Sequence, residues 1–149
     1  MKIVNRKFNR EYQEIEKYEA GIVLSGGEVK SIRGGGLRLE EAYVKIVGNE
    51  LQLINAEISA YRFAKNDNYD PKRTRKLLLH KKELVRLQTK IRGSGRLTIV
   101  PVSCYNKGNI LKLEIALVKG RQDIEKRKYD KQKKIERDQK REVKEHFKS

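Results

Sequence analysis

The chain has 149 residues, enough for one domain with a sizeable core, but only 37% of them are hydrophobic while 38% are charged. We therefore expect part of the chain to lie outside the packed core. The net charge of +16 predicts a polyanionic partner, bound with an affinity that falls as the salt concentration rises.

The polyanion is either nucleic acid or, as the alternative, an anionic membrane surface. No apolar stretch approaches the roughly 20 residues that span a bilayer, and the polar start of the chain shows no signal peptide. The single cysteine, Cys104, excludes an intramolecular disulfide framework. The simplest interpretation is a reduced, cytoplasmic protein that binds nucleic acid.

The first predicted element is a helix over roughly residues 20–32. Val29 and Ile32 share one face of this helix, and the glycines at 34–36 end it. Gly26-Gly27 weakens the prediction, because glycine is a poor helix former.

A hairpin and a second helix are predicted next. The apolar runs 43–47 and 51–54 are joined by Gly48-Asn49, a good hairpin connection. Apolar residues at helical spacing predict a helix over roughly 81–91, which Gly93-Ser94-Gly95 ends.

A second hairpin follows, formed by strands at 97–102 and 111–118 around the turn at 106–109. Pro101 implies an edge position or a bulge in its strand, and Cys104 is also expected to lie in a strand. The number of short strands predicts a mainly β fold: a closed, oligonucleotide-binding-like β-barrel with flanking helices over residues 1–120.

The segment after Gly120 differs in composition, because residues 121–149 contain neither glycine nor proline and have few apolar positions. Both parts of the chain are basic. We expect this C-terminal tail to be disordered when free and helical when bound to a polyanion; a merely solubilising tail is the alternative.

The run DPKRTRKLLLH at 70–80 is the most informative segment for function. Asp70-Pro71 marks a turn, since proline disfavours helical geometry in the residue before it. The cations that follow are Lys72, Arg73, Arg75 and Lys76, and three leucines come next at 77–79. Cations anchored to buried leucines indicate a phosphate-contacting loop held in a fixed place.

Tyrosines are the main aromatic residues of the domain, and they are Tyr12, Tyr18, Tyr43, Tyr61, Tyr69 and Tyr105. Tyr61-Arg62-Phe63 and Tyr69 flank the basic run, a pattern in which rings stack on bases while cations contact phosphates. For any single tyrosine, however, a place in the core or in a strand is favoured. A second basic stretch at 5–10 is either an ordered arm or a frayed terminus.

Catalysis has little support in the sequence. The two histidines, His80 and His146, and the single cysteine provide no zinc site. The glycine clusters lack the spacing of a nucleotide-phosphate loop, and Glu40-Glu41 fits a surface ion pair. His80 either stacks on a base or caps the next helix, and capping is favoured. We therefore expect no enzyme, cofactor or metal.

Five stretches, in this order, resemble the SsrA-binding protein family, SmpB, over essentially the whole chain. They are NRKFNREY (5–12), YEAGIVLSGGEVKSIRGG (18–35), YVKI (43–46), DPKRTRKLLLHKKEL (70–84) and LEIALVKG (113–120). The resemblance implies an RNA-binding protein that is monomeric when free. Such a protein carries transfer-messenger RNA (tmRNA), bound by its tRNA-like domain, to bacterial ribosomes stalled without a stop codon.

The resemblance also implies which residues contact RNA. In the domain they are Asn5, Arg10, Glu19, Arg73, Arg75, Lys76, Leu78, His80 and Gly120, the glycine from which the tail departs. In the tail, the ribosome-binding residues implied are Lys126, Arg127, Lys133, Lys134, Arg137, Lys140 and Arg141. Glu125 stands where the family has aspartate before Lys126-Arg127, a conservative departure that keeps the charge.

The resulting hypothesis gives the two basic parts different RNA surfaces. The barrel holds the elbow of the tRNA-like domain, while the tail enters the empty mRNA channel and folds against ribosomal RNA near the decoding centre. The rival interpretations are a stoichiometric ribosomal protein and a nuclease. Washing the ribosome at raised salt separates the first rival, and incubation with labelled RNA tests the second.

Overall fold

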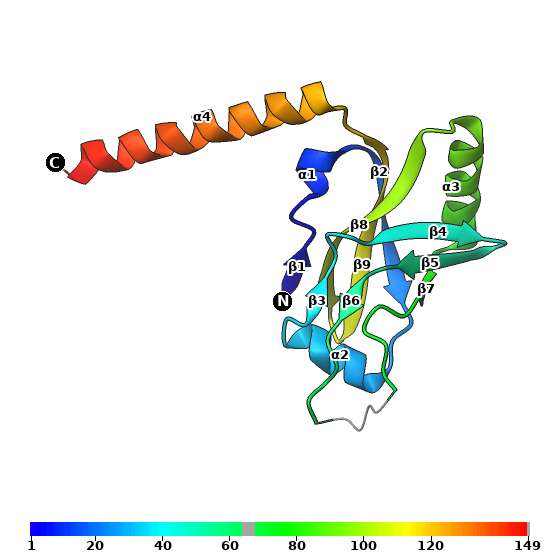
Figure 1. Ribbon diagram of the computed structural model, residues 1–149. Coiled ribbons are helices and arrows are strands. Elements are labelled where there is room, and N and C mark those ends of the chain that lie inside the picture. The colour runs from blue at the N-terminus through cyan, green and yellow to red at the C-terminus, as the bar shows by residue number, and fades with distance from the viewer. Residues whose placement is uncertain (64–67, 149) are drawn as a thin grey trace.

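The computed structural model describes residues 1–63 and 68–148. Its centre is an antiparallel sheet with the strand order β1-β8-β4-β5-β7-β2-β9, and a further pairing of β8 with β9 closes the strands after β1 into a ring (Figure 1). The sheet's strands are β1 (Lys2–Val4), β2 (Tyr12–Ile22), β4 (Tyr43–Val47), β5 (Glu50–Ile54), β7 (Arg75–Leu78), β8 (Leu97–Lys107) and β9 (Ile110–Gly120). A separate pair joins β3 (Leu37–Arg38) to β6 (Glu57–Ile58).

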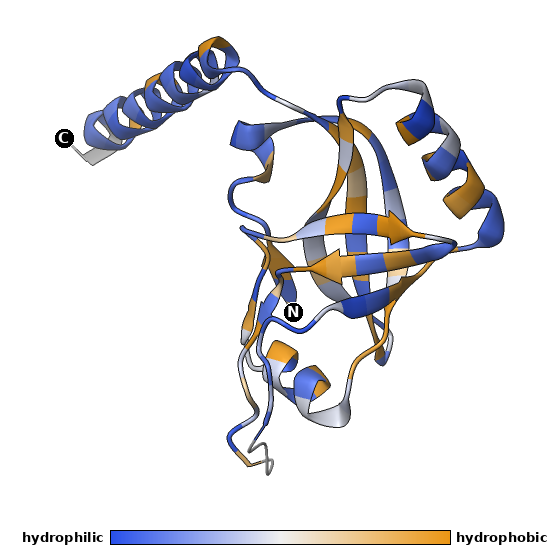
Figure 2. Cartoon of the chain, turned by 45° about the vertical axis from the view of Figure 1, so that its right-hand side comes forward, coloured by the Kyte–Doolittle hydropathy of each residue, from blue (hydrophilic) through white to orange (hydrophobic). Residues whose placement is uncertain are grey.

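Alternate residues of the strands fill the inside of the ring. In β9, Leu111, Leu113, Ile115 and Leu117 are buried, as their alternation predicts. Cys104 lies in β8, as expected, and is buried in the same core. Figure 2 shows hydrophobic and hydrophilic residues alternating along these strands. The mainly β prediction is thereby confirmed.

A smaller core lies on the other side of β8 and β9. Val100, Ala116 and Val118 are buried there against Phe8, the first residue of α1 (Phe8–Glu11). Burial on both faces explains why residues 115–118 of β9 are buried without interruption. The start of the chain is therefore an ordered arm packed on the ring, one of the two possibilities for this stretch.

Both predicted hairpins are present, each with a Gly-Asn turn. Gly48 and Gly108 have φ of 64°, the conformation required at the first central residue of a type II′ turn. The register of β8 against β9 shifts between Pro101 and Ser103, so the bulge expected at this proline is confirmed.

The helix predicted over 20–32 is wrong in its first part, because β2 continues to Ile22 and α2 spans Gly26–Arg33. Ser25 and Glu28 form a capping box, in which the Ser25 side chain accepts from the Glu28 N–H and the Glu28 carboxylate accepts from the Ser25 N–H. This cap outweighs the low helix propensity of Gly26-Gly27 at the start of the helix.

The second predicted helix is α3 (Lys81–Gly93), which packs on the core through the fully buried Leu87. His80 occupies its N-cap position, but its side chain makes no capping hydrogen bond. The expected capping role of this side chain is thus wrong, although the helix begins where it was predicted.

The tail is one continuous helix, α4 (Asp123–Lys148), where we expected disorder in the free chain. Its residues are mostly good helix formers, and its first turns are fixed to α1 by ion pairs. Lys126 Nζ lies 2.8 Å from Glu11 Oε2, and Arg10 Nε lies 3.0 Å from Asp130 Oδ1. Beyond these contacts α4 extends away from the ring (Figure 1).

Candidate nucleic-acid interface

The basic run at 70–80 forms β7 and the connection before it, but one of its cations is fully buried. Arg75 donates to Glu28 Oε2 from Nε (2.9 Å) and from Nη2 (2.7 Å). Its Nη1 donates to the backbone oxygen of Ala56 (2.8 Å). The side chain has no exposed surface in the free protein, and the direct RNA contact expected of Arg75 stays a prediction.

Glu28, in α2, is the carboxylate around which this connection is organised. Burial alone would raise its pKa, but the Ser25 N–H and the guanidinium groups of Arg73 and Arg75 lower the pKa to about 2. Tyr69 adds a hydrogen bond from its hydroxyl to the Ile58 carbonyl (3.0 Å). Sequence reasoning missed Glu28, although the Ser-x-x-Glu spacing at 25–28 is a recognisable capping signal.

Other cations of the run stay accessible. Lys72 and Lys76 are exposed, and Arg73 keeps 41% of its side chain exposed while it pairs with Glu28. The network therefore holds the backbone of the run in place and leaves these three cations at the surface, which fits the prediction of a fixed phosphate-contacting loop.

A second group of side chains lies on the outer face of the ring, and we call it the outer-face patch. Its members are Glu19 of β2, Leu78 of β7, Tyr105 and Lys107 of β8 and Lys112 of β9. The strand register brings them together. Gly21 of β2 lies opposite Leu78 on one side and opposite Lys112 on the other. Lys112 in turn lies opposite Tyr105. Four strands, of which only β8 and β9 are consecutive in the chain, therefore contribute to one surface.

Glu19 is the centre of this patch. The Tyr105 hydroxyl donates to Glu19, and Lys107 Nζ lies 2.9 Å from its Oε1. These contacts lower the pKa of Glu19, while burial and the Glu19 carboxylate raise the pKa of Tyr105 to about 12. At neutral pH the patch thus presents a carboxylate acceptor, which suits amino and imino donors of base edges and repels phosphates.

Leu78 is the apolar member of the patch, and 52% of it is exposed. A Cβ added at Gly21 would lie 3.4 Å from Leu78 Cβ, so the leucine lies against a residue without a side chain. An exposed leucine supported in this way can pack against a sugar or a base.

Several tyrosines have structural roles. Tyr18 is buried and its hydroxyl donates to Glu16, while the ring of Tyr12 lies 6.2 Å from that of Phe8. Tyr69 belongs to the Glu28 network. Tyr43, Tyr61 and Tyr105 keep exposed surface and remain available for stacking.

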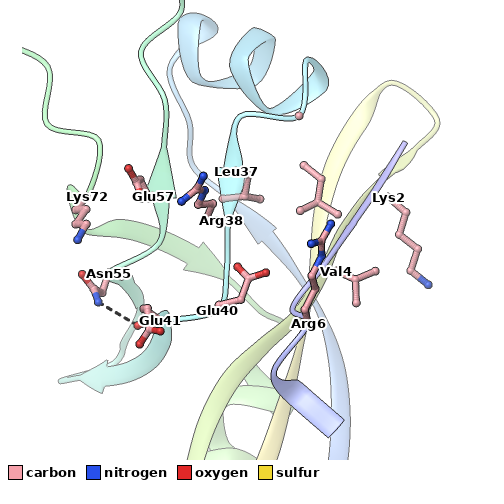
Figure 3. Close-up of a pocket in the computed structure, with 12 residues that line it drawn as sticks. Lys2, Val4, Arg6, Leu37, Arg38, Glu40, Glu41, Asn55, Glu57 and Lys72 are labelled. Carbon is pink, nitrogen blue, oxygen red and sulfur yellow. Dashed lines mark hydrogen bonds between the residues drawn. The ribbon is translucent and has the colours of Figure 1, made fainter. Parts of the chain in front are cut away.

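A separate cleft of about 770 Å³ is lined by residues of β1, β3 and β6 and of the neighbouring loops (Figure 3). Lys2, Arg6, Arg38 and Lys72 line it together with Glu40, Glu41 and Glu57. Because four cations and three carboxylates line this cleft together, it suits a polyanion less well than the basic run does. Within 1–63 and 68–148 there is also no group of three or more His, Cys, Asp or Glu side chains that could hold a metal ion.

The comparisons with known proteins agree along nearly the whole chain. The family model described as SmpB protein matches residues 2–145. The SsrA-binding protein of Sulfurihydrogenibium sp. (strain YO3AOP1) is 47% identical over 97% of this chain and 91% of its own length. That of Carboxydothermus hydrogenoformans is 49% identical over 83% of this chain and 82% of its own length.

A solved structure, "tmRNA-SmpB: a journey to the center of the bacterial ribosome", matches with a TM-score of 0.67 and 39% identity. The match covers 82% of this chain and 85% of that one. The chain belongs to the SmpB family. The resemblance that the five sequence stretches predicted is therefore confirmed.

The first SmpB stretch, residues 5–12, lies at the end of the ring that α4 contacts. Asn5 is buried, and its side chain donates to the Pro101 carbonyl (2.9 Å) and accepts from the Lys7 N–H (3.1 Å). The bond to Pro101 joins the start of the chain to β8 and gives Asn5 a structural role, while its direct contact with RNA stays a prediction.

Arg10 is exposed, but it is engaged by the tail. Besides the Asp130 contact, its Nη1 lies 2.7 Å from Glu11 Oε1. Arg121, just before α4, donates its backbone N–H to the Glu11 carbonyl (2.8 Å). A contact of Arg10 with RNA, which stays a prediction, would share its guanidinium with Asp130 and Glu11 or displace them.

The remaining predicted site residues keep at least part of their surface exposed. His80 is exposed beside β7, and Gly120 ends β9 opposite Tyr12, where the chain leaves the ring. Of the predicted tail cations Lys126 is partly buried, whereas Arg127, Lys133, Lys134, Arg137, Lys140 and Arg141 are exposed along α4. No helix in the part of the chain described here is long and apolar enough to cross a membrane.

Proposed function

We propose that this chain is an RNA-binding adaptor of trans-translation. It binds the tRNA-like domain of tmRNA and delivers it to stalled bacterial ribosomes, where the nascent chain is tagged and the ribosome is released. The observation that carries this proposal is the SmpB match over residues 2–145, which includes both the ring and most of α4.

The arrangement of charge supports a division into two RNA surfaces. The outer-face patch combines an ionised carboxylate, a tyrosine and a leucine with Lys107 and Lys112, so it can select shape and bases as well as bind phosphates. The tail offers exposed cations along one helix, in excess over the carboxylates between them, which suits a contact with ribosomal RNA that depends on charge and length.

The ring is proposed to act as an oligonucleotide-binding-like barrel, and α4 is proposed to enter the empty mRNA channel. The end of α4 far from Asp130 extends away from the ring (Figure 1). An isolated helical segment of this kind frays readily, and ribosomal RNA would then fix it as a helix.

The decisive experiment compares binding of the full chain to tmRNA and to an ordinary elongator tRNA over a series of salt concentrations. We expect tmRNA to bind more tightly at every salt concentration, because the patch adds contacts that do not depend on counterion release. Equal affinity for the two RNAs throughout the series would show generic cation binding and would overturn the proposal.

A further inference from the structure

The connection between β6 and β7 exposes an aromatic pair that the outer-face patch does not include. Phe63 has 73% of its surface exposed, more than any other large hydrophobic residue of the described ranges. The rings of Tyr61 and Phe63 meet edge to face, with centroids 5.5 Å apart. Arg62 Cζ lies 4.7 Å from the Phe63 centroid, and Lys30 Nζ lies 5.4 Å from the Tyr61 centroid.

Helix α2 contacts both this pair and the basic run. Lys30 of α2 contacts Tyr61, and Glu28 of the same helix binds Arg73. The Ile58 N–H donates to the Pro71 carbonyl (2.9 Å), which brings the two ends of the connection together. The aromatic pair and the expected phosphate-contacting cations Lys72, Arg73 and Lys76 therefore lie on segments that are joined to each other and to α2.

The aromatic pair also lies where an RNA bound at the outer-face patch could reach it. Arg33 of α2 donates to the Asn109 carbonyl (2.8 Å) in the β8–β9 turn, close to Lys107. Figure 1 places α2 at the opposite end of the molecule from α1 and α4. The aromatic pair thus lies at the patch end of the ring, away from the tail.

Charge at the pair favours a nucleic acid over an apolar protein surface. Within the described part of the chain, neither Lys30 nor Arg62 forms a salt bridge with a carboxylate. An exposed ring with a guanidinium over one face and cations beside it is the arrangement that stacks an unpaired base and neutralises its phosphate.

We propose that Phe63 stacks on an unpaired base of the bound RNA, with Arg62 on the other face of the ring and Lys30 near the adjoining phosphate. This proposal deepens the proposed function and rests on it, since the RNA is the tRNA-like domain of tmRNA. It adds a stacking contact to the hydrogen-bonding surface around Glu19.

The test measures the affinity of full-length variants for tmRNA. Phe63→Ala should weaken binding by about 5- to 150-fold, which corresponds to the loss of one base–aromatic stack. Phe63→Tyr keeps an aromatic ring and should retain most of the parent affinity. Phe63→Leu should remain weak, because it keeps apolar surface without a ring face. Ile124→Ala, at a residue of similar exposure in α4, is the matched control and should bind like the parent chain.

Two further readouts separate stacking from a contribution of charge or of apolar surface alone. The salt dependence of Phe63→Ala should equal that of the parent chain, since no cation is removed. Unchanged affinity of Phe63→Ala, or full affinity of Phe63→Leu, would overturn the stacking contact. Failure of the proposed function is distinguishable, because the parent chain itself would then show no preference for tmRNA over tRNA.

Discussion

The ring and α4 are both basic, but they hold their cations in different ways. In the ring, the ion pair between the buried side chains of Arg75 and Glu28 fixes the basic run at 70–80. The neighbouring cations Lys72, Arg73 and Lys76 face the solvent. In α4, every residue from 130 to 146 is exposed, and the helix depends on its own propensity and on contacts near its start. A surface that must recognise a shape needs buried support, whereas a surface that must follow a channel needs only charge and length.

The sharpest test of this contrast is removal of the tail. Deleting residues 121–149 should leave tmRNA binding nearly intact and abolish tagging on stalled ribosomes. The ring keeps its RNA surface, whereas the protein loses the tail that is proposed to contact the ribosome. Binding and in vitro tagging measure the two effects.

A matched control for the deletion replaces the tail cations Lys133, Lys134 and Arg137 with alanine, which preserves helix propensity. We expect reduced tagging with unchanged tmRNA affinity and helix content. If tmRNA binding and tagging fell equally in both variants, the division of labour between ring and tail would be wrong.

Removing one partner of the buried ion pair should have the next largest effect. Arg75→Ala leaves the Glu28 carboxylate buried with fewer partners, so we expect a loss of about 3–5 kcal/mol in the free energy of unfolding. Chemical denaturation measures this loss. Arg127→Ala in α4 should change the stability little, and a comparable loss there would contradict the contrast.

The Glu28 network should also make the stability of the ring depend on pH. The folded pKa of Glu28, about 2, lies below its ordinary value of 4.5, so its contribution is complete above pH 4.5 and is lost as the pH falls toward about 2. Thermal unfolding between pH 2 and pH 6 should show this loss in the parent chain. Glu28→Gln should be less stable at pH 6 and lose less on acidification; parallel curves would contradict the assignment.

A smaller effect should separate the exposed cations from the buried one. Replacing Lys72 and Lys76 with alanine should flatten the salt dependence of tmRNA binding by about 0.7–0.9 log unit for each phosphate that is no longer neutralised. Arg75→Ala, measured where it remains folded, should leave the slope unchanged. A slope that changed only in the Arg75 variant would reverse the roles given to these residues.

Sequence reasoning succeeded where local patterns decide the structure. The Gly-Asn turns, the bulge at Pro101 and the alternating leucines of β9 each follow from a few neighbouring residues. The membership in the SmpB family came from short stretches in a fixed order, and the family model and relatives confirm it.

It failed where the partner is distant in sequence. Arg75 lies in a run of cations, and its buried ion pair with Glu28, 47 residues away, was not predicted. Asn5 likewise lies in a basic stretch, but it binds the Pro101 carbonyl 96 residues later. The tail was expected to be disordered from its charge, and its contacts with α1 could not be read from composition.

The contact between Arg10 and Asp130 has a thermodynamic consequence. If Arg10 binds RNA, as the family resemblance implies, and gives up Asp130 to do so, RNA and α4 compete for one guanidinium group. By linkage, docking of α4 must weaken RNA binding by the same factor by which RNA weakens docking. The tail would then be freed more often in the complex than in the free protein, so loading with tmRNA would itself prepare α4 to search for an empty channel.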